Sequence, residues 1–420
     1  MGLALKGIRI LDLTDSIVGP YSTTLLASCG AEVIRVESRL HLGFRRGGSS
    51  ARGAEGIPQV PESQIDYSKV DMRRLVSPLF TQLNHDKMSV ALNLTRPEGR
   101  ELFKRLVKVS DVVADNFSFD VMQKWGFSYP ELQKLRDDII VINLQAFGRG
   151  PYEAWSTWGM NLLSYTGFAY SWGHPDTPMT DRAASSYHGD YIAGTKAALA
   201  VVSALWHRAK TGEGQHIQLS QAESAASVLG PSFLDFFVNH RVNPPRGNRH
   251  PEFAPYSLYR CQGHDQWCVI AVSSETEWRQ FCQAIGQPPW TEDVKFKDMP
   301  SRRRNVDELD QNVERWTTQR TPHQVMKFLQ EFGVPAGAAQ TSEHLYYDLA
   351  HRTRGYMFDV DMFGIGKVTY AGVPIRLSDG QKPRWERAPV LGEHNDYVYR
   401  QLIGLTADEI KKYEETKVIF

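Results

Sequence analysis

Apolar residues follow two alternating patterns along the first 150 residues. Between the short β-rich runs, apolar residues recur every three or four positions. In "RPEGRELFKRLVKVS", for example, Leu102, Leu106 and Val109 share one helical face. The β-rich runs read "IRILDLT", "AEVIRVE", "KMSVALNL", "DVVADNF" and "IIVINLQAF". Strands that alternate with helices predict an α/β fold with a parallel, doubly wound sheet.

Local signals predict where some of these helices begin and end. Gly19-Pro20 opens the helix "PYSTTLLASCG", because proline is favoured in a first helical turn, and Gly30 is expected to end it. Thr95 is expected to cap the helix that follows it. Residues 38–77 interrupt the rhythm with a stretch rich in Gly, Ser, Arg and Pro, which is typical of a functional or disordered loop.

The second half of the chain begins with a long apolar helix, "GTKAALAVVSALWHRAK". A strand and a Pro- and Gly-rich connector follow, and "YRCQGHDQWCVIAV" predicts a hairpin with its turn at residues 262–265. The run Arg302-Arg303-Arg304 is expected on a solvated helix face. We predict four segments: 1–200, the N-terminal part of a large domain; 201–245, a linker helix and connector; 246–332, a small domain; and 333–420, a return linker and the C-terminal part of the large domain.

Composition narrows the function classes. The 420 residues include 48 Lys plus Arg and 48 Asp plus Glu, so a net charge of zero gives no support to nucleic-acid binding or a basic membrane-surface role. No stretch approaches the ~18 apolar residues of a membrane span, and the N-terminus is typical of a strand rather than a signal peptide. Four cysteines without CxxC spacing predict reduced thiols in a cytoplasmic protein and no metal site.

The first strand–helix–strand unit imitates a dinucleotide-binding fold, and Glu37 stands where such folds bind ribose. The turn "DSIVGPYS", however, lacks the G-x-G-x-x-G pattern that lets backbone amides approach a pyrophosphate. No Walker-type phosphate loop is present either. We therefore expect neither a nicotinamide nor a flavin cofactor.

Asp190 is the candidate catalytic residue. It stands in "SSYHGDYIAGTKAALA", between a glycine and the start of the long apolar helix. A carboxylate there is typical of a helix cap, which accepts hydrogen bonds from first-turn amides. It is also a potential nucleophile, and the residues alone leave both interpretations open.

Four segments in order resemble the class III CoA-transferases, the family of formyl-CoA and carnitine CoA-transferases. The resemblance runs from Leu5 to about Asp396. It implies a large Rossmann-like domain with a smaller α+β domain. It also implies an interlocked dimer, formed with a second copy or with a subunit of similar fold. The segments are "LKGIRILDLTDSIVGPYSTTLLASCGAEVIRVE", "NHDKMSVALNLTRPEGRELFKRLVKVSDVVADNF", "GDYIAGTKAALAVVSALWHRAKTGEGQHIQLSQAES" and "AGVPIRLSD…RAPVLGEHND".

The resemblance implies that Asp190 is the nucleophile. Its carboxylate would attack the thioester of a donor acyl-CoA and then carry CoA as an aspartyl thioester, which a free carboxylic acid takes over. The helix N-terminus favours the charged carboxylate, and Gly189 is expected to leave room for the substrate carbonyl. Coenzyme A would enter as a co-substrate, without a metal.

The resemblance also implies which residues bind CoA. Val18 and Gly19 match the turn that faces the thioester and pantetheine, and Asn116-Phe117 matches a segment along the pantetheine. Taken singly, Asn116 would be a turn former and Phe117 a core residue.

Three basic residues match positions near the phosphates and adenine of CoA: Arg39, Lys87 and Lys124. Cations there would suit a ligand with several phosphate charges. Taken singly, Lys87 and Lys124 would be solvated charges.

The chain also departs from the family pattern. Ser38 replaces one of two basic residues, and "LQAFG" carries Gln145 and Ala146 in place of Ser and Gly. Gly263 is the one glycine of the hairpin turn that would correspond to a glycine-rich flap. These departures bear on how the loops close over the site.

Two alternatives remain. The same fold houses α-methylacyl-CoA racemases, which use a His and an Asp, but Trp158 stands near that His position; His188 is a weaker substitute. The chain could also be a subunit of a hetero-oligomeric CoA-transferase. The tryptophans of "YEAWSTWGMNLLSYTGFAYSWGHP" indicate an aromatic-walled pocket or a core, and such a pocket would suit aromatic or branched dicarboxylic acids.

Overall fold

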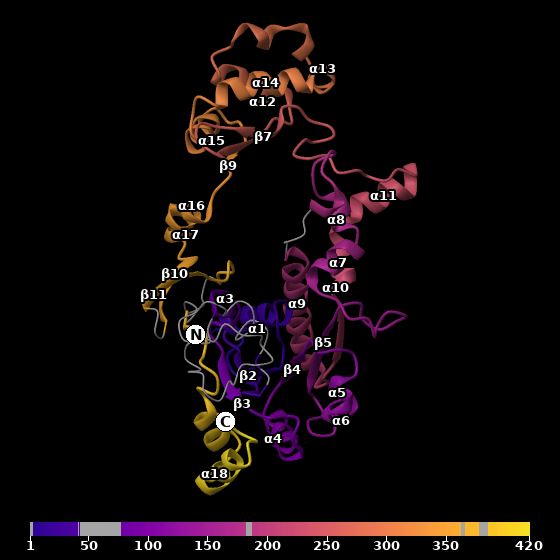
Figure 1. The fold of residues 1–420 in the computed structure, drawn as a ribbon, viewed down its shortest axis with the longest axis vertical. Helices are drawn as coiled ribbons and strands as arrows, with labels where there is room; N and C mark the ends of the chain where they lie inside the picture. The colour runs from indigo at the N-terminus through magenta and orange to yellow at the C-terminus, as the bar shows by residue number, and fades with distance from the viewer. Residues whose placement is uncertain (1–2, 41, 43–76, 182–186, 363–365, 378–384) are drawn as a thin grey trace. The chain divides into compact units, whose positions relative to one another are not determined.

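The computed structural model describes residues 3–40, 42, 77–181, 187–362, 366–377 and 385–420. The chain forms two compact units, each described here by itself (Figure 1). The first, called the sheet unit, consists of Met1–Phe168, Ser185–Leu234 and Ala350–Phe420. The second unit consists of Ala169–Ala184 and Asp235–Leu349. The finer four-part division expected from the sequence stays a prediction.

A six-stranded parallel sheet forms the centre of the sheet unit. Its strand order, β3-β2-β1-β4-β5-β6, is that of a Rossmann-like doubly wound fold. The α/β class and the parallel sheet expected from the hydrophobic pattern are thereby confirmed. The strands are β1 (Arg9–Asp12), β2 (Glu32–Glu37), β3 (Met88–Ala91), β4 (Val112–Asp115), β5 (Ile140–Gln145) and β6 (His216–Ser220).

Helices cover both faces of this sheet, because neighbouring strand residues point to opposite sides. Ile10 and Val112 face the core shared with α1 (Val18–Ser28) and α9 (His188–Thr211). Leu11 and Val113, one position further along each strand, face the core shared with α4 (Pro97–Lys108) and with Val398 and Tyr399 near the C-terminus. Figure 1 shows α1 and α9 beside the strands.

Small residues bring α9 close to α1. The buried face of α9 is mostly alanine and glycine. A Cβ added to Gly194 would lie 2.8 Å from the carbonyl oxygen of Val18 and 3.0 Å from the ring of Tyr21. The second turn of α9 therefore meets the first turn of α1.

The remaining elements of the sheet unit are shorter. Two strands, β10 and β11, pair antiparallel, apart from the main sheet. The elements are α3 (Pro78–Asn84), α5 (Val121–Lys124), α6 (Tyr129–Gln133), α7 (Gly159–Tyr165), α10 (Gln221–Ala226), β10 (Met357–Met362), β11 (Gly366–Ala371) and α18 (Ala407–Glu415).

Two local predictions in the sheet unit are corrected. Arg96, not Thr95, is the N-cap residue of α4. The Thr95 hydroxyl instead donates to the side-chain oxygen of Asn93, at 2.6 Å. Helix α1 begins at Val18, two residues before Pro20. Its C-cap residue is Cys29, and Gly30 follows with a φ of 105°, which confirms the expected end of this helix.

The second unit is an antiparallel sheet, β7-β8-β9, packed with helices. The pairing of Arg260 with Trp267 confirms the hairpin expected around residues 262–265. Arg302 does not lie on a solvated face, because its guanidinium is fully buried and bonds Glu275 and the Ala254 carbonyl. The elements are β7 (Tyr256–Arg260), β8 (Trp267–Ala271), α12 (Glu275–Ala284), α13 (Met299–Arg304), α14 (Val306–Thr317), α15 (Pro322–Glu331), β9 (Ala336–Ala338) and α16 (Ser342–Tyr347).

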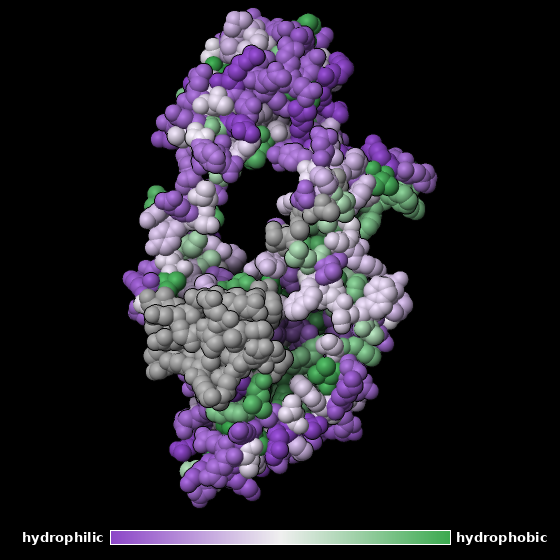
Figure 2. Space-filling model, viewed as in Figure 1, coloured by the Kyte–Doolittle hydropathy of each residue, from purple (hydrophilic) through white to green (hydrophobic). Residues whose placement is uncertain are grey.

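Helix α11 (Gly230–Asn239) carries an exposed apolar surface. Figure 2 shows this helix as a strongly hydrophobic strip. Its exposed residues are Phe233, Leu234, Phe236, Phe237 and Val238. Large exposed apolar patches are typical of protein–protein contact sites.

The described part of the chain shows three further general features. None of its helices is both long and apolar enough to cross a membrane. All four cysteines are free thiols. Within the same residues, no group of three or more His, Cys, Asp or Glu side chains is placed to bind a metal ion.

Candidate active site

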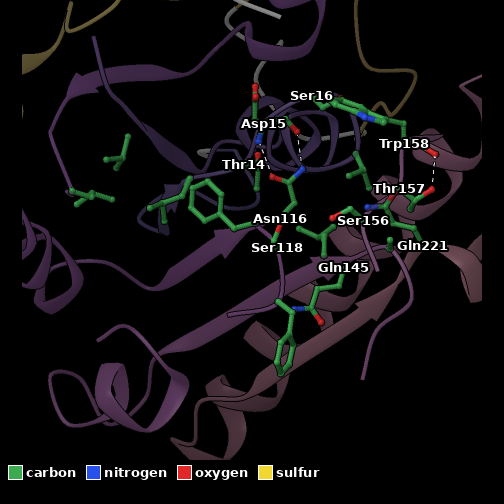
Figure 3. A pocket seen from close by; sticks show the side chains of 18 of the residues that line it. Thr14, Asp15, Ser16, Asn116, Ser118, Gln145, Ser156, Thr157, Trp158 and Gln221 are labelled. Carbon is green, nitrogen blue, oxygen red and sulfur yellow. Dashed lines mark hydrogen bonds between the residues drawn. The ribbon is translucent and has the colours of Figure 1, made fainter. Parts of the chain in front are cut away.

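A cavity of about 800 Å³ lies in the sheet unit at the carboxyl ends of the parallel strands. Strand order reverses between β1 and β4, and the loops that leave these two strands both line the cavity. Open α/β sheets bind ligands at this switch point. Figure 3 shows the lining residues from close by. They include Thr14, Asp15, Ser16, Asn116, Ser118, Gln145, Ser156, Thr157, Trp158 and Gln221.

The cavity is elongated across the sheet. Its lining extends from Leu92–Thr95, after β3, to Gln145 and Ala146, at the end of β5. Four strand spacings of about 4.8 Å separate β3 from β5, which gives a length of roughly 19 Å. A cavity of this length suits an extended ligand with its reactive group at one end.

Asp190 lies at the β5 side of this cavity. It is the third residue of α9, and only 9% of its surface is exposed. The N-cap residue is Tyr187, whose carbonyl accepts hydrogen bonds from the backbone N–H of Asp190 and Tyr191. Asp190 is thus not the capping residue of α9. The first turn nevertheless places its carboxylate at the positive end of the helix dipole.

Two glycines near Asp190 have different roles. A Cβ added to Gly159 would lie 2.5 Å from Oδ2 of Asp190, so the carboxylate occupies the space that a side chain at 159 would need. A Cβ added to Gly189 would instead meet Leu163 at 3.1 Å and Ala225 at 3.7 Å. The space beside Gly189 is thus bordered by Leu163 and Ala225, and its expected role in the approach of a substrate carbonyl stays a prediction. Sequence reasoning missed Gly159, because nothing local to "TWGMN" shows that it contacts Asp190.

Asn116 joins the two loops at the switch point. Its side-chain oxygen accepts from the Asp15 N–H at 2.8 Å, and its amide nitrogen donates to the Asp15 carbonyl at 2.7 Å (Figure 3). Phe117 lies edge-on to Trp125, with ring centroids 5.4 Å apart. All four residues line the cavity, as does Val18. The structure thus brings Val18, Asn116 and Phe117 together with Asp190.

A buried carboxyl group lies directly behind Asn116. Asp115 accepts hydrogen bonds from the Phe117 backbone N–H, at 3.3 Å, and from the Asn143 side chain. Asn143 in turn contacts His216, which stacks on Tyr129. Burial raises the pKa of Asp115 to about 7. This carboxyl group therefore changes charge near neutral pH, next to the wall of the cavity.

Lys87 lies outside the cavity lining, in the interior of the sheet unit. Its ammonium group donates to Asp12 at 3.0 Å, to the Pro20 carbonyl at 2.9 Å and to Asn84 at 3.0 Å, which uses all three of its protons. Burial lowers the pKa of Lys87 to about 8. Burial alone would raise the pKa of Asp12, but Lys87 and Arg35 outweigh it and lower that pKa. The pair is charged at neutral pH and stabilises the start of α1.

Arg35, which sequence reasoning missed, is a buried cation that lines the cavity. Its guanidinium donates to the Thr14 carbonyl at 2.7 Å and pairs with Glu37 at 3.1 Å and Asp15 at 3.6 Å. Glu37 also accepts from the Ser89 hydroxyl at 2.7 Å. These contacts give Glu37 a structural role in place of ribose binding. A single arginine in a buried strand is typical of an ordinary structural ion pair. The sequence around Arg35 therefore does not indicate that this residue lines the site.

Three other candidates lie at or beyond the edge of the cavity. Gly19 is outside the lining, and a Cβ there would overlap the Thr14 side chain at 2.2 Å. Arg39 is half-buried between Ser38 and Leu40, which both line the cavity. Lys124, with 70% of its side chain exposed, pairs with Asp120 on α5. The structure does not bring these residues into the lining itself.

Comparisons with known proteins identify the family of this chain. The model of CoA-transferase family III matches residues 5–395. Formyl-CoA:oxalate CoA-transferase of Bradyrhizobium sp. (strain ORS 278) is 29% identical over 99% of this chain and 97% of its own length. Succinyl-CoA–D-citramalate CoA-transferase of Chloroflexus aurantiacus is 30% identical over 99% of this chain and 98% of its own.

The fold has a solved counterpart. The crystal structure of a CAIB/BAIF family protein from Brucella suis matches 96% of this chain and all of its own, with a TM-score of 0.81 and 26% identity. The chain belongs to CoA-transferase family III and is an enzyme of the transferase class. The resemblance stated from the sequence is thereby confirmed.

Proposed function

We propose that this enzyme moves CoA from an acyl-CoA donor to a free carboxylic acid through an aspartyl-CoA thioester at Asp190. The observation that carries the proposal is the position of Asp190. Its carboxylate lies in the first turn of α9, at one end of an elongated cavity at the switch point of the sheet. Succinyl-CoA is a suitable donor, since the name of the Chloroflexus relative includes it.

The proposed reaction divides one exchange into four substitutions at carbonyl groups. An oxygen of Asp190 attacks the donor thioester carbonyl and expels CoA thiolate, which leaves a mixed anhydride. The thiolate then attacks the Asp190 carbonyl, forms the aspartyl-CoA thioester and releases the donor acid. The acceptor carboxylate attacks this thioester and again expels thiolate. Attack of the thiolate on the acceptor carbonyl gives the new acyl-CoA and restores the Asp190 carboxylate.

The residues of the chain would support this reaction by binding and orientation. Gly159, which has no side chain, makes room for the Asp190 carboxylate, and the first turn of α9 favours the negative charge that each cycle restores. Val18, Asn116 and Phe117 would flank the pantetheine arm, since they line the same cavity.

The phosphates of CoA would lie toward the β2–β3 side of the cavity, away from Asp190. Arg39, which follows β2, is proposed as a cation near that edge. Lys124, on α5 after β4, is proposed as a second cation at the rim beside Trp125, which lines the cavity. Lys87 is proposed as a support for Asp12 and α1, because its protons are all donated within the interior. Arg35 would present its edge to the ligand from the cavity wall.

The proposal includes a dimer with a second copy of the chain or with a subunit of similar fold. The exposed apolar surface of α11 supports a protein contact of this kind.

Mass analysis of the peptides provides the test. Incubation with succinyl-CoA alone should leave CoA covalently bound to the peptide that contains Asp190. Asp190→Ala should lose transfer by several powers of ten while still binding CoA. Asp181→Ala serves as the matched control, because Asp181 lies outside the cavity lining. Full activity of Asp190→Ala would contradict the proposed function.

A further inference from the structure

Five aromatic side chains lie on the segment that follows β5 and on α7, and four of them are in ring contact. The Phe147 ring lies 4.9 Å from Tyr165 and 5.8 Å from Trp155, both edge-on, and Tyr152 lies 4.1 Å from Trp155. Trp158 is the N-cap residue of α7, three positions after Trp155. Edge-to-face and tilted contacts of this kind hold aromatic rings in fixed orientations.

Two of these rings border the cavity and are open to solvent. The exposed fraction is 54% for Trp155 and 60% for Trp158, and both residues line the cavity. Figure 3 shows the indole of Trp158 reaching across the cavity toward Ser16. Exposure of large apolar rings in a cavity is unfavourable unless a ligand covers them, so it is typical of a binding surface.

This aromatic surface lies beside the nucleophile. Gly159, which follows Trp158 directly, is the residue whose missing Cβ makes room for the Asp190 carboxylate. Most polar side chains from the same side of the lining are uncharged, namely Gln145, Ser156, Thr157, Asn161 and Gln221. The carboxylate of Glu153, which also lines this side, pairs with Arg149 at 3.6 Å. An acid bound here would lay its body against the indole faces and direct its carboxyl group toward Asp190.

We infer that the acceptor is an aryl carboxylic acid whose ring stacks on Trp158, with Trp155 extending the same surface. This inference rests on the proposed function, because it assigns the body of the acid that takes CoA from Asp190. A planar aromatic body gains contact with indole faces beyond what an aliphatic chain of equal length gains.

Competition between acceptors tests the inference. With succinyl-CoA as donor, kcat/KM should be at least tenfold higher for 3-phenylpropionate than for butyrate or glutarate. Trp158→Ala should lower kcat/KM for 3-phenylpropionate about tenfold more than kcat/KM for butyrate, mostly through KM. Trp158→Phe should retain most of the preference, since it keeps an aromatic face. Trp206→Ala is the control, because Trp206 is equally exposed on α9 but outside the cavity.

A second measurement separates the two claims. The amount of CoA bound covalently to Asp190 after incubation with donor alone involves no acceptor, and it also reports whether each variant is folded. Asp190 could be labelled with CoA while the enzyme shows no preference for 3-phenylpropionate, or keeps this preference in Trp158→Ala. Either result would overturn the acceptor class and leave the proposed function intact. A failure to label Asp190 in the unmodified enzyme would overturn both.

Discussion

At the scale of the residue, a missing Cβ determines where the Asp190 carboxylate can lie. Gly159→Ala would place a methyl group 2.5 Å from Oδ2, which forces the carboxylate or the start of α7 to move. Displacement of a nucleophile by about 1 Å costs on the order of 100-fold in rate. We expect kcat to fall by about that factor while CoA affinity, measured by calorimetry, changes little.

Gly189→Ala is the matched control for this prediction. Its added methyl group would meet the flexible end of Leu163 at 3.1 Å and the side chain of Ala225 at 3.7 Å. Its kcat should stay within a few-fold of the unmodified enzyme. Equal kcat values for the two variants would show that contact with Gly159 does not position Asp190.

The raised pKa of Asp115 predicts that the unfolding free energy depends on pH. Burial raises its pKa from 3.8 to about 7, so between these pH values the folded protein binds more protons at this site than the unfolded chain. The contribution of this carboxyl group to the unfolding free energy is fully present below about pH 4 and is lost as the pH rises through 7. The loss is on the order of 4 kcal/mol.

Asp115→Asn removes this titration, because an amide has no proton to lose in that range. Chemical denaturation at pH 5 and pH 8 should therefore show a smaller loss of unfolding free energy in the variant than in the unmodified protein. Asp120→Asn, with an exposed carboxylate on the same loop, should keep the original slope. If the unfolding free energy of Asp115→Asn depends on pH as strongly as that of the unmodified protein, the titrating group lies elsewhere.

Sequence reasoning reached some residues of the site and not others. Asp190, Val18, Asn116 and Phe117 line one cavity, since each follows a strand or begins a helix at the same edge of the sheet. Lys87 could not be placed, because its burial depends on Asp12, which lies 75 positions away in the chain. Contacts across such separations leave no local pattern.

At the scale of the element, the close contact between α1 and α9 sets the position of the nucleophile. Gly194→Leu would drive a side chain into the Val18 carbonyl and the Tyr21 ring, which lie within 3.0 Å of the added Cβ. We expect a loss of about 1–3 kcal/mol in unfolding free energy, as for other overpacked interfaces. Leu199→Ala, on the exposed face of the same helix, should change stability by about 0.5 kcal/mol or less.

Strands were easier to predict than the segments between them. The five strands expected in the first 150 residues are buried on both faces, so each appears as a compact apolar run. The cavity wall at residues 153–159 has no such periodicity, because irregular segments take their conformation from what they contact. The expected loop at residues 38–77 lies almost entirely outside the described residues.

At the scale of the whole molecule, the fold alone does not decide the reaction type. The parallel sheet, its switch point and the elongated cavity would serve a CoA-transferase or a racemase of acyl-CoA thioesters equally well. The choice depends on which groups face the substrate. A transferase needs a nucleophile, and Asp190 lies at the cavity. A racemase needs two acid–base groups on opposite sides of one α-carbon.

The sequence resemblance implies that Trp158 stands near the position of the racemase histidine, and an indole does not exchange protons with a carbon acid. We therefore expect that a chiral 2-methylacyl-CoA, incubated with the enzyme in deuterated water without an acceptor acid, will neither racemise nor take up deuterium at its α-carbon. Mass spectrometry and chiral chromatography measure the two outcomes. The same preparation should pass CoA from succinyl-CoA to a free acid. Rapid deuterium uptake in the absence of transfer would instead establish proton abstraction as the main chemistry of this cavity.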